Sequence, residues 1–369
     1  MNNTAAPGGN VRLKLVLIGD GQSPHLLKWA RALAPLVDLY AVSSRGFDTG
    51  FDAVLAPERR LALATRPRFE GGNAALLRTL PRLVKFLQAV QPDWLAPHYL
   101  SSHGTLAWLA VRLGGVQARI VGSAWGSDIL VAPQQSRLMH WLTRQVLAAC
   151  TLATSDSAHM AQRMRALGAG EVLNFPFGVE RLPALPAHKD EALFFANRGL
   201  EPIYAPRRVL ATFEALARHW PEARLVLAND GSLLAALRAE VAASPMAPRV
   251  QFVGRLNATE QAGWYARARW YLSLPSSDSI SVSVLEAMAH GCIPILSDLP
   301  ANHELVQDGR SGVILADGEQ PGRSRLAPLA ERADAVAAEL HDWVGSHALF
   351  PASVQIYVQR LLALTPPRR

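Results

Sequence analysis

One local pattern recurs along the chain: a short apolar run followed by a longer segment that is apolar on one helical side. "VRLKLVLIG" and "PHLLKWARALAPL" form the first such pair, and "ALFFAN" with its following segment restarts the series after a break. Short apolar runs are typical of strands buried on both faces, and their alternation with helices predicts parallel sheets. The break is "GVERLPALPAHKDE", residues 178–191, which has prolines and little periodicity. The sequence therefore predicts two α/β sheets in tandem.

Two doubly wound, Rossmann-like domains account for the length of 369 residues, because an ordinary domain has about 100–200 residues. The predicted organisation is a disordered lead over 1–10, an N-terminal domain over 11–180, a linker over 181–191, a second domain over 192–345, and a C-terminal helix and tail over 346–369 for which the first domain is a packing partner. Ligands of such sheets bind outside the carboxyl ends of the strands. Site residues are therefore expected on loops that follow strands.

Composition excludes some classes of protein. Half of the residues are hydrophobic, yet the chain lacks the run of about 18 apolar residues that a membrane-spanning helix needs. Residues 1–10 are polar and lack the basic-then-apolar layout of a signal peptide. Cys150 and Cys292 stand in apolar contexts, which favours buried reduced thiols and a cytoplasmic protein.

The net charge of +7 and the pI near 9.8 favour an anionic partner: a phosphorylated small molecule, an acidic membrane surface or nucleic acid. Arg78, Arg82 and Lys85 form one stripe of a predicted helix, with Pro81 at a kink or in the first turn. The stripe is either a solvated surface or a patch that contacts anionic lipid heads at the inner face of the cytoplasmic membrane. Nucleic acid is disfavoured, because aromatic residues do not alternate with the basic ones.

The segment "SSDSISVSVLEAMAHG", residues 276–291, carries two acids, Asp278 and Glu286. Ser283 and Glu286 fit a capping box, in which the carboxylate serves folding only. Alternatively, the loop and the helix start offer backbone amides to phosphate or hydroxyl groups, and the two carboxylates accept hydrogen bonds from a sugar nucleotide. The residues of this segment alone leave both interpretations open.

The longer segment from Ser276 to Leu315 resembles the donor-site signature of the GT-B glycosyltransferases called family 4, or glycosyl transferases group 1. The signature has an acid, seven residues, then a Glu followed by "AMA" and a Gly and a Pro. Its tail is seen here as Ser297-Asp298, Glu304, Asp308-Gly309 and Gly312. "LVLIGDGQSPHLLKWARALA", "GSAWGSDIL", "FFANRGLEPIY", "LANDGS" and "VQFVGRL" resemble further landmarks of the family.

The resemblance implies a GT-B fold, with two Rossmann-like domains facing a cleft, and the transfer of a sugar from a nucleotide diphosphate to an acceptor hydroxyl with retention. By the same resemblance Glu286 binds the ribose, and Asp278 binds the donor sugar. Arg198 neutralises the pyrophosphate. The other positions that we assign to nucleotide and donor on this basis are Gly19, Gly21, Gly254, Ser279, Ile280 and Ser281.

The sequence departs from the family pattern in three places. Asp278 is one methylene shorter than the usual Glu, and Ser279 and Ser281 stand where Gly is frequent. Tyr204 stands where a Lys often follows the Arg, and a phenol cannot neutralise a diphosphate. We therefore predict that Arg207 or Arg208 compensates, with an ordinary role on a helix surface as the open alternative.

The implied reaction builds negative charge on the leaving diphosphate, which Arg198 and the amides of the helix start would stabilise. We expect Arg198, Asp278 and Asp128 of "WGSD" to be the catalytic residues, although Asp128 also suits a helix N-cap. No D-x-D sequence follows a predicted strand, so we expect no metal requirement. No cofactor is expected beyond the co-substrate, a UDP- or GDP-sugar.

His25, His98 and His103 follow predicted strands and are expected to line the acceptor side, with packing or capping as the alternative for each; His103 is the favoured contact. Glycan or lipid-linked acceptors, as in polysaccharide, lipopolysaccharide or glycolipid assembly, are what the resemblance implies. Two other functions stay open: a non-catalytic partner that kept the scaffold, which Tyr204 supports, and a GT-B nucleotide-sugar epimerase or hydrolase, for which we find no clear acid–base set.

Overall fold

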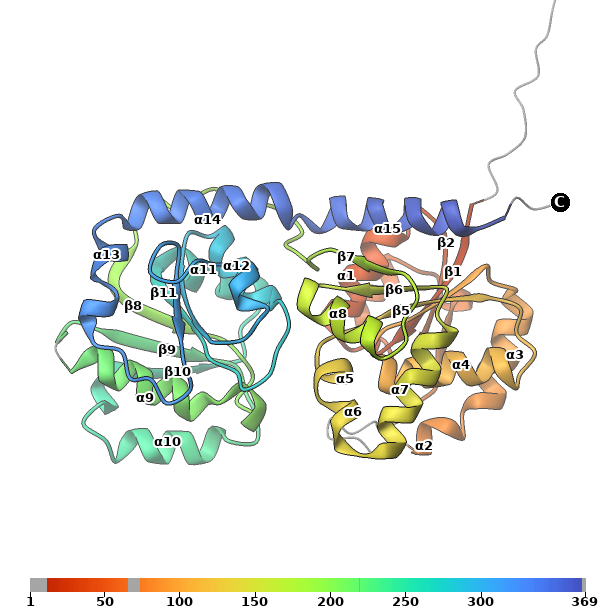
Figure 1. Cartoon of the computed structure of the whole chain (residues 1–369), viewed down its shortest axis with the longest axis horizontal. Coiled ribbons are helices and arrows are strands. Elements are labelled where there is room, and N and C mark those ends of the chain that lie inside the picture. Colours follow the sequence, from red (N-terminus) through yellow and green to blue (C-terminus); the bar gives the residue numbers. More distant parts are fainter. Residues whose placement is uncertain (1–11, 66–73, 219, 367–369) are drawn as a thin grey trace, which may run out of the picture. The chain divides into compact units, whose positions relative to one another are not determined.

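The computed structural model of the protein describes residues 12–65, 74–218 and 220–366, so the predicted lead over 1–10 lies outside the described residues. The chain forms two compact units (Figure 1). Unit 1 holds the residues up to Thr154, Arg163–Leu173 and the segment from Val354, and unit 2 holds Ser155–Gln162 and Asn174–Ser353. Within the described ranges, no helix is long and apolar enough to cross a membrane.

Unit 1 is built around a sheet with the strand order β3-β2-β1-β4-β5-β6-β7 in the described part of the chain. Its strands are β1 (Lys14–Gly19), β2 (Asp38–Ser43), β3 (Arg60–Ala62), β4 (Trp94–Pro97), β5 (Arg119–Ser123), β6 (Leu152–Ser155) and β7 (Val172–Asn174). The helices are α1 (Pro24–Leu33), α2 (Ala74–Leu77), α3 (Leu80–Val90), α4 (Thr105–Arg112), α5 (Ser127–Leu130), α6 (Ala132–Gln135) and α7 (Arg137–Ala149), and a π-helical turn spans Leu100–Gly104. α8 (Ala158–Ala166) belongs to unit 2 up to Gln162 and to unit 1 from Arg163.

Unit 2 repeats the plan with the strand order β10-β9-β8-β11-β12-β13 among its described residues. Its strands are β8 (Asp190–Ala196), β9 (Arg224–Ala228), β10 (Val250–Gly254), β11 (Ala268–Ser273), β12 (Ile293–Ser297) and β13 (Val313–Leu315). The helices are α9 (Pro206–Ala217), α10 (Leu234–Ala242), α11 (Ala258–Arg267), α12 (Val282–Ala289), α13 (Ala327–Ala330) and α14 (Ala333–His347). The prediction of two parallel, doubly wound α/β sheets is thus confirmed.

The sequence pattern explains the core of each unit. All six residues of β11 are buried, as the apolar run predicted for a strand covered on both faces. In unit 1, Val16 and Ile18 of β1 share one cluster with Leu83 and Leu87 of α3. Pro81 lies in the first turn of α3, where its missing N–H costs no intrahelical hydrogen bond, and this settles the choice between a kink and a helix start.

Each sheet has one switch point, where the chain leaves on opposite sides of a central strand. In unit 1 the central strand β1 lies between β2 and β4, and in unit 2 β8 lies between β9 and β11. Loops that leave the carboxyl ends of two such neighbouring strands diverge and leave room for a ligand between them. The loops after β1 and β4, and those after β8 and β11, are therefore the places where a site is expected.

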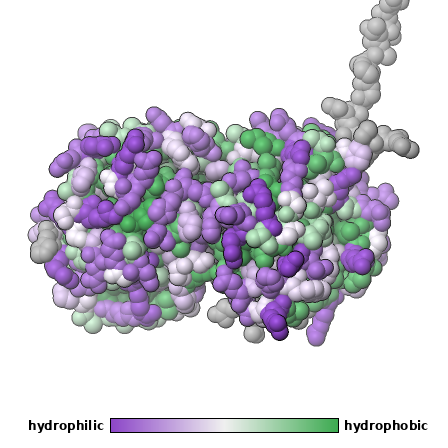
Figure 2. All heavy atoms as spheres, viewed as in Figure 1, coloured by the Kyte–Doolittle hydropathy of each residue, from purple (hydrophilic) through white to green (hydrophobic). Residues whose placement is uncertain are grey.

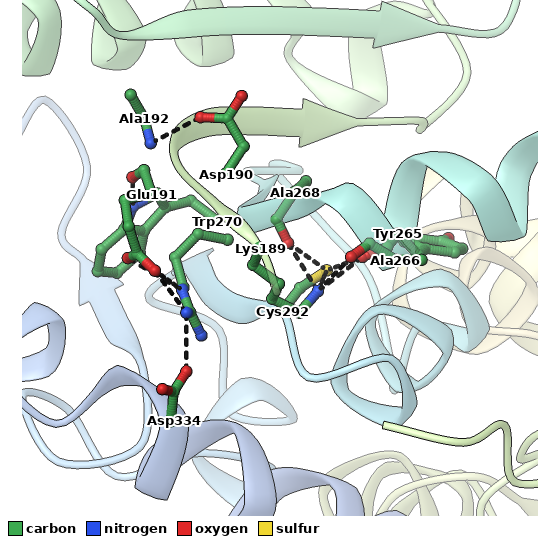
Figure 3. Close-up of polar contacts among 11 residues, drawn as sticks. Lys189, Asp190, Glu191, Ala192, Tyr265, Ala266, Ala268, Trp270, Cys292 and Asp334 are labelled. Carbon is green, nitrogen blue, oxygen red and sulfur yellow. Dashed lines mark hydrogen bonds and ion pairs between the residues drawn. The ribbon is translucent and has the colours of Figure 1, made fainter. Parts of the chain in front are cut away.

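The start of β8 in unit 2 is held by partly buried polar contacts (Figure 3). The ammonium of Lys189 donates to the carbonyls of Tyr265 and Ala268 at 2.7 and 2.8 Å and lies 3.6 Å from the Cys292 thiol. β8 begins right after it, at Asp190. The predicted linker 181–191 is thus two residues too long, because Asp190 already lies in register with Ala268 of β11.

Both cysteines are buried free thiols, as predicted. Burial raises the pKa of Cys150 to about 12. Burial also raises the pKa of Cys292, against the nearby charge of Lys189. Neither sulfur is therefore ionised near neutral pH, in keeping with a packing role.

The last helix, α15 (Phe350–Leu364), belongs to unit 1 from Val354 onward. The Tyr357 ring lies 5.2 Å from that of Trp29, and the indole N–H of Trp94 donates to Thr365 Oγ1 at 2.8 Å. The structure also divides the chain differently from the predicted boundary at 180. Residues 155–162 belong to unit 2, where the Ser157 hydroxyl hydrogen bonds to the Ser279 hydroxyl and the His159 backbone amide donates to Glu304. The segment from Asn174 belongs to unit 2 as well.

Candidate functional site

The loops after β8 and β11 meet through an ion pair. The Arg198 guanidinium follows β8, and its Nη2 lies 2.8 Å from Oδ2 of Asp278 in the loop after β11. The two side chains are only 17 and 19% exposed. Burial raises the pKa of Asp278, and the charge of Arg198 opposes that rise. The structure thus brings together two residues that the sequence placed on separate loops, at the switch point of unit 2.

Three further groups fix the Arg198 guanidinium. Its Nη1 donates to Ser281 Oγ in a short hydrogen bond and lies 3.4 Å from Ser283 Oγ. The Tyr204 ring stacks beneath it, with the guanidinium carbon 4.4 Å from the ring centroid. Tyr204 therefore holds the cation by a cation–π contact instead of adding a second positive charge.

The predicted compensation for Tyr204 is not what the structure shows. Arg207 forms an ion pair with Glu240 of α10 at 2.6 Å, and its side chain is 53% exposed. Arg208 donates to the carbonyls of Leu315 and Ala316 at 2.8 and 2.7 Å. Both guanidinium groups lie at the start of α9 but are committed to partners other than the Arg198 cluster.

Glu286 is not a capping residue. α12 begins at Val282, with Ser281 at the N-cap, so Ser283 is the second helical residue and Glu286 the fifth. A reciprocal box would need the acid at the third position. The carboxylate instead accepts hydrogen bonds from the Gln261 amide at 2.8 Å and the Tyr265 hydroxyl at 3.1 Å, both on α11.

The loop before α12 is largely buried, with Ser279, Ile280 and Ser281 at 3, 7 and 5% exposure. The amide of Ser279 donates to the Asp278 carboxylate at 3.0 Å, and the backbone of Ile280 bonds to Asp156. These amides, predicted to contact the donor sugar, have internal partners here. Gly254 ends β10 two strands from β8 with a φ of +71°, a left-handed backbone that suits glycine.

Asp156 is a site residue that the sequence analysis missed. It follows β6, is 6% exposed, and accepts a short hydrogen bond from the Ser279 hydroxyl. The Ser157 and Ser279 hydroxyls are 2.7 Å apart. Burial and the nearby Asp278 charge raise the pKa of Asp156 to about 8, against the Ser279 hydrogen bond. An acid directly after a predicted strand was the available signal.

Glu304 of the signature forms hydrogen bonds next to the contact between Asp156 and Ser279. Its carboxylate accepts from the backbone amides of Ala158 and His159 at 2.8 and 2.9 Å, at the first turn of α8. A carboxylate there satisfies two otherwise unpaired helix-start amides and complements the helix dipole. Residues 156–159 are thereby bonded at one end to the loop after β11 and at the other to the segment after β12.

In unit 1 the predicted glycines serve close packing. A Cβ on Gly19 would lie 2.6 Å from a Leu26 methyl, and one on Gly21 would lie 2.7 Å from the carbonyl oxygen of Gly46. The Gly21 amide donates to Ser43 Oγ at 2.8 Å. A side chain at either position would push the loop after β1 off its neighbours.

Histidines occupy the loops at the switch point of unit 1. His98 directly follows β4 and is 4% exposed, and neither ring nitrogen is hydrogen bonded to a described residue. His103 Nδ1 donates to the His98 carbonyl at 2.7 Å, which leaves Nε2 as a buried acceptor without a described partner. Burial, then the charges of His103 and His25, lower the pKa of His98 to about 3. Burial also lowers that of His103. Both imidazoles are therefore neutral.

A row of aromatic rings leads from the surface to these histidines. The exposed His25 ring lies 5.2 Å from Trp125, and Trp125 lies 5.5 Å from His98. Between His98 and the π-helical turn, Tyr99 has a φ of +76°, a sterically costly backbone for a residue with a side chain. Such strain is concentrated at functional sites, and here it accompanies buried histidine nitrogens.

Asp128 is placed to hold this loop cluster together. It is fully buried, and its carboxylate accepts from the backbone amides of Leu100 and Trp125 at 2.7 and 2.9 Å. Burial raises its pKa to about 6, and the backbone donors oppose that rise. It lies inside the short helix α5, so it is not the N-cap, and with both oxygens occupied it is a positioning residue.

Among the described residues, no group of three or more His, Cys, Asp or Glu side chains is arranged to hold a metal ion. In unit 2 the structure offers a ligand the Arg198 guanidinium and the Ser281 and Ser283 hydroxyls as donors, with Glu286 as an acceptor, and this set suits an anion and the hydroxyl groups of a sugar. In unit 1 the His103 Nε2 is a separate buried acceptor.

Sequence comparison decides the family. Residues 191–327 match the family described as Glycosyl transferases group 1, and residues 14–157 match Glycosyl transferase 4-like. The chain belongs to the group 1 glycosyltransferases. In this glycosyltransferase chain, the range 191–327 contains Arg198 and the signature from Asp278 to Gly312. The range 14–157 contains the acceptor-side candidates His25, His98 and His103.

Two curated relatives are similar over part of their length. The chain is 25% identical over 234 residues to a GDP-mannose:cellobiosyl-diphosphopolyprenol alpha-mannosyltransferase of Komagataeibacter xylinus, covering 58% of this chain and 56% of the relative. It is 32% identical over 103 residues to the lipopolysaccharide core biosynthesis mannosyltransferase LpcC of Rhizobium leguminosarum bv. viciae, covering 27% of this chain and 29% of that protein. The chain thus spans about half or less of each relative.

Solved structures share the fold. Anabaena Alr3699/HepE in complex with UDP has a TM-score of 0.73 at 13% identity, over 95% of this chain and 100% of that one. Sucrose-phosphate synthase from Thermosynechococcus elongatus has a TM-score of 0.75 at 15% identity over the same shares. The GT-B fold that the sequence predicted is confirmed.

Proposed function

We propose that the protein is a retaining glycosyltransferase that moves a hexose from a nucleotide diphosphate sugar to a hydroxyl of a glycan or lipid-linked acceptor in the cytoplasm. The observation that carries the proposal is the cluster at the switch point of unit 2. There a largely covered arginine after β8, an acid after β11 and Glu286 on α12 come from three separate segments. This is the arrangement that a diphosphate next to a ribose diol requires.

In the proposed reaction the bond between the anomeric carbon and the diphosphate breaks, and negative charge grows on the leaving phosphate. Arg198 stabilises that charge, and its fixed position lowers the reorganisation needed during the reaction. Glu286 accepts hydrogen bonds from the ribose. The leaving phosphate oxygen takes the proton of the attacking hydroxyl on the same face of the sugar, which retains the anomeric configuration without a carboxylate nucleophile.

The acceptor hydroxyl is assigned to unit 1. His103 Nε2 is a buried acceptor with its tautomer fixed by the His98 carbonyl, so it can receive the hydrogen bond of an incoming hydroxyl. Asp128 holds the loops that carry it. We further propose that the reaction needs no metal ion, because Arg198 supplies the positive charge on the diphosphate.

The test is a donor hydrolysis and transfer assay on the purified protein. GDP-mannose is the first donor to try, since the name of the K. xylinus relative includes it, and UDP-glucose is the second, since a structure of HepE was solved with it. Release of nucleotide diphosphate that is lost in Glu286→Gln, kept in the exposed control Glu222→Gln and unchanged by a chelator supports the proposal. NMR of the product's anomeric proton decides between retention and inversion.

The alternative of a non-catalytic partner has one observation in its favour, the Tyr204 ring where a second cation would add charge. It predicts nucleotide-dependent thermal stabilisation without turnover for any donor and acceptor. Turnover with one donor excludes it.

A further inference from the structure

Unit 1 has a surface whose charge the proposed reaction does not explain. Residues 74–150 contain seven Lys or Arg and only two acids, Asp93 and Asp128. Both acids are engaged within the unit, since Asp93 accepts from the Lys14 amide at 2.7 Å and Asp128 is fully buried. Exposed cations lie on three helices: Arg82 and Lys85 on α3, Arg112 on α4, and Arg137 and Arg144 on α7. No ion pair between described residues neutralises any of these five.

Large apolar side chains are exposed on the same helices. Leu138 and Trp141 of α7 are 68 and 51% exposed, and Leu113, directly after α4, is 71% exposed. On α7 the spacing i, i+4 and i+7 sets Arg137, Trp141 and Arg144 along one stripe, with Leu138 beside it. Single exposed apolar residues are ordinary, but here they are interleaved with unpaired cations.

The three helices are neighbours. α4 packs against both α3 and α7 (Figure 1). The Trp108 ring of α4 lies 6.2 Å from that of Trp141, and the Gln88 amide of α3 donates to the carbonyl of Gly114, just past Leu113, at 3.0 Å. Figure 2 shows hydrophobic and strongly hydrophilic residues intermixed over the part of unit 1 that α7 crosses.

We propose that this α3–α4–α7 surface, made of the five cations with Leu113, Leu138 and Trp141, docks the protein on a lipid bilayer with anionic headgroups. Cations attract such a surface, while tryptophan and leucine insert at the level of the headgroups. A nucleic acid would use the cations but would leave the leucines without a partner. Arg82 and Lys85 of the stripe predicted from the sequence form one edge of this surface, whereas Arg78 lies in the turn before α3 and not on the same helix. α7 adds the apolar part.

Vesicle co-sedimentation of the full chain tests the proposal without any donor or acceptor. Vesicles of equal parts phosphatidylcholine and phosphatidylglycerol bind the protein, and vesicles of phosphatidylcholine alone do not. Arg137→Gln/Arg144→Gln lowers partitioning about 25-fold, as each cation near an anionic surface contributes about fivefold. Leu138→Ser/Trp141→Ser removes the part of the binding that survives raised salt.

Matched control variants distinguish binding through this surface from nonspecific adsorption to vesicles. Ile356→Ser/Leu362→Ser removes two α15 side chains that are 51 and 52% exposed, and Arg218→Gln/Arg238→Gln removes two exposed cations of unit 2. Both controls bind as the natural sequence does. Brominated lipid quenches tryptophan fluorescence in the natural sequence, and less in Trp141→Phe.

Several results overturn the proposal. These are absence of binding to the anionic vesicles, equal losses in the control variants, or unchanged binding of the Leu138→Ser/Trp141→Ser protein. Tighter binding to single-stranded DNA than to vesicles, with sensitivity to the α7 charges alone, assigns the surface to nucleic acid instead. Circular dichroism and thermal unfolding of each variant verify that the exposed substitutions leave the fold intact.

Discussion

Removing the Arg198 side chain tests the central ion pair of unit 2. In Arg198→Met, Asp278 loses the guanidinium that lies 2.8 Å away and is left at 19% side-chain exposure. Breaking a buried pair by removing one partner costs about 3–5 kcal/mol, because the other charge stays buried without compensation. For a unit of this size each kcal/mol lowers the unfolding temperature by about 2–4 °C, so we expect a fall of about 6–20 °C for unit 2.

The second arm of the experiment removes both charges. Arg198→Met/Asp278→Asn has no uncompensated carboxylate, so it should recover at least about 2 kcal/mol of the loss, since most of the cost of a broken buried pair is the stranded charge. Acidification should also rescue the single variant. Burial already raises the pKa of Asp278, and loss of Arg198 raises it further. The carboxyl then becomes neutral as the pH falls, and the folded state regains stability.

Urea unfolding of the natural sequence, both single variants and the double variant, at several pH values, completes the cycle. Nucleotide at 100 times its Kd should stabilise the natural sequence by about 2.7 kcal/mol, and the Arg198→Met proteins by much less. Additive losses in the double variant would refute the claim that the two charges compensate each other. Undiminished nucleotide stabilisation without Arg198 would refute its contact with the diphosphate.

Three further predictions concern single residues. Glu286→Gln keeps the shape of the side chain but loses the charge, so kcat/KM for the donor should fall about 10- to 150-fold, which corresponds to the loss of one charge-assisted hydrogen bond. An unchanged kcat/KM would show that the Glu286 carboxylate does not bind the donor. The pKa of Asp156 is raised to about 8, so this carboxyl keeps its proton at neutral pH in the folded state. The free energy of unfolding should therefore fall as pH rises from 6 and level off above about 8. Unfolding measured across this range should show no such slope in Asp156→Asn, and an equal slope in that variant would refute the assignment. His103→Gln should lower kcat for transfer while donor hydrolysis stays the same, and equal losses in both assays would place His103 outside the acceptor contacts.

The sequence predicted what depends on periodicity and chain order. Apolar runs located the strands, and the order of strands and helices implied sheets with loops gathered at one edge. Asp278 could be placed on a loop because it follows a predicted strand, whereas Arg198 was named through the family resemblance. Glu286 could be named only through the family signature, since the local residues fitted a capping box equally well.

The contacts that could not be predicted join side chains that are distant in sequence. Asp156 meets Ser279 across 123 positions, a pairing that no local pattern carries. Arg207 looked available for phosphate, but a long flexible side chain takes the best-placed acid, and here that acid is Glu240. The capping box at Ser283 was wrong by two positions, because α12 starts at Val282 and the hydroxyl of Ser283 accepts from Tyr271 at 2.9 Å instead.

The division of the chain has a consequence for biosynthesis. Unit 1 is assembled from the residues up to Thr154, a short piece after β6, and the segment from Val354. Tyr357 contacts Trp29 of α1, and Thr365 contacts Trp94 of β4. The two indole rings therefore gain these contacts only when the segment from Val354 has been synthesised. All of unit 2 must therefore be synthesised before the first unit can close its core. Unit 1 thus begins to form before unit 2 but is completed after it. A nascent chain stalled before α15 exposes those rings to chaperones and proteases.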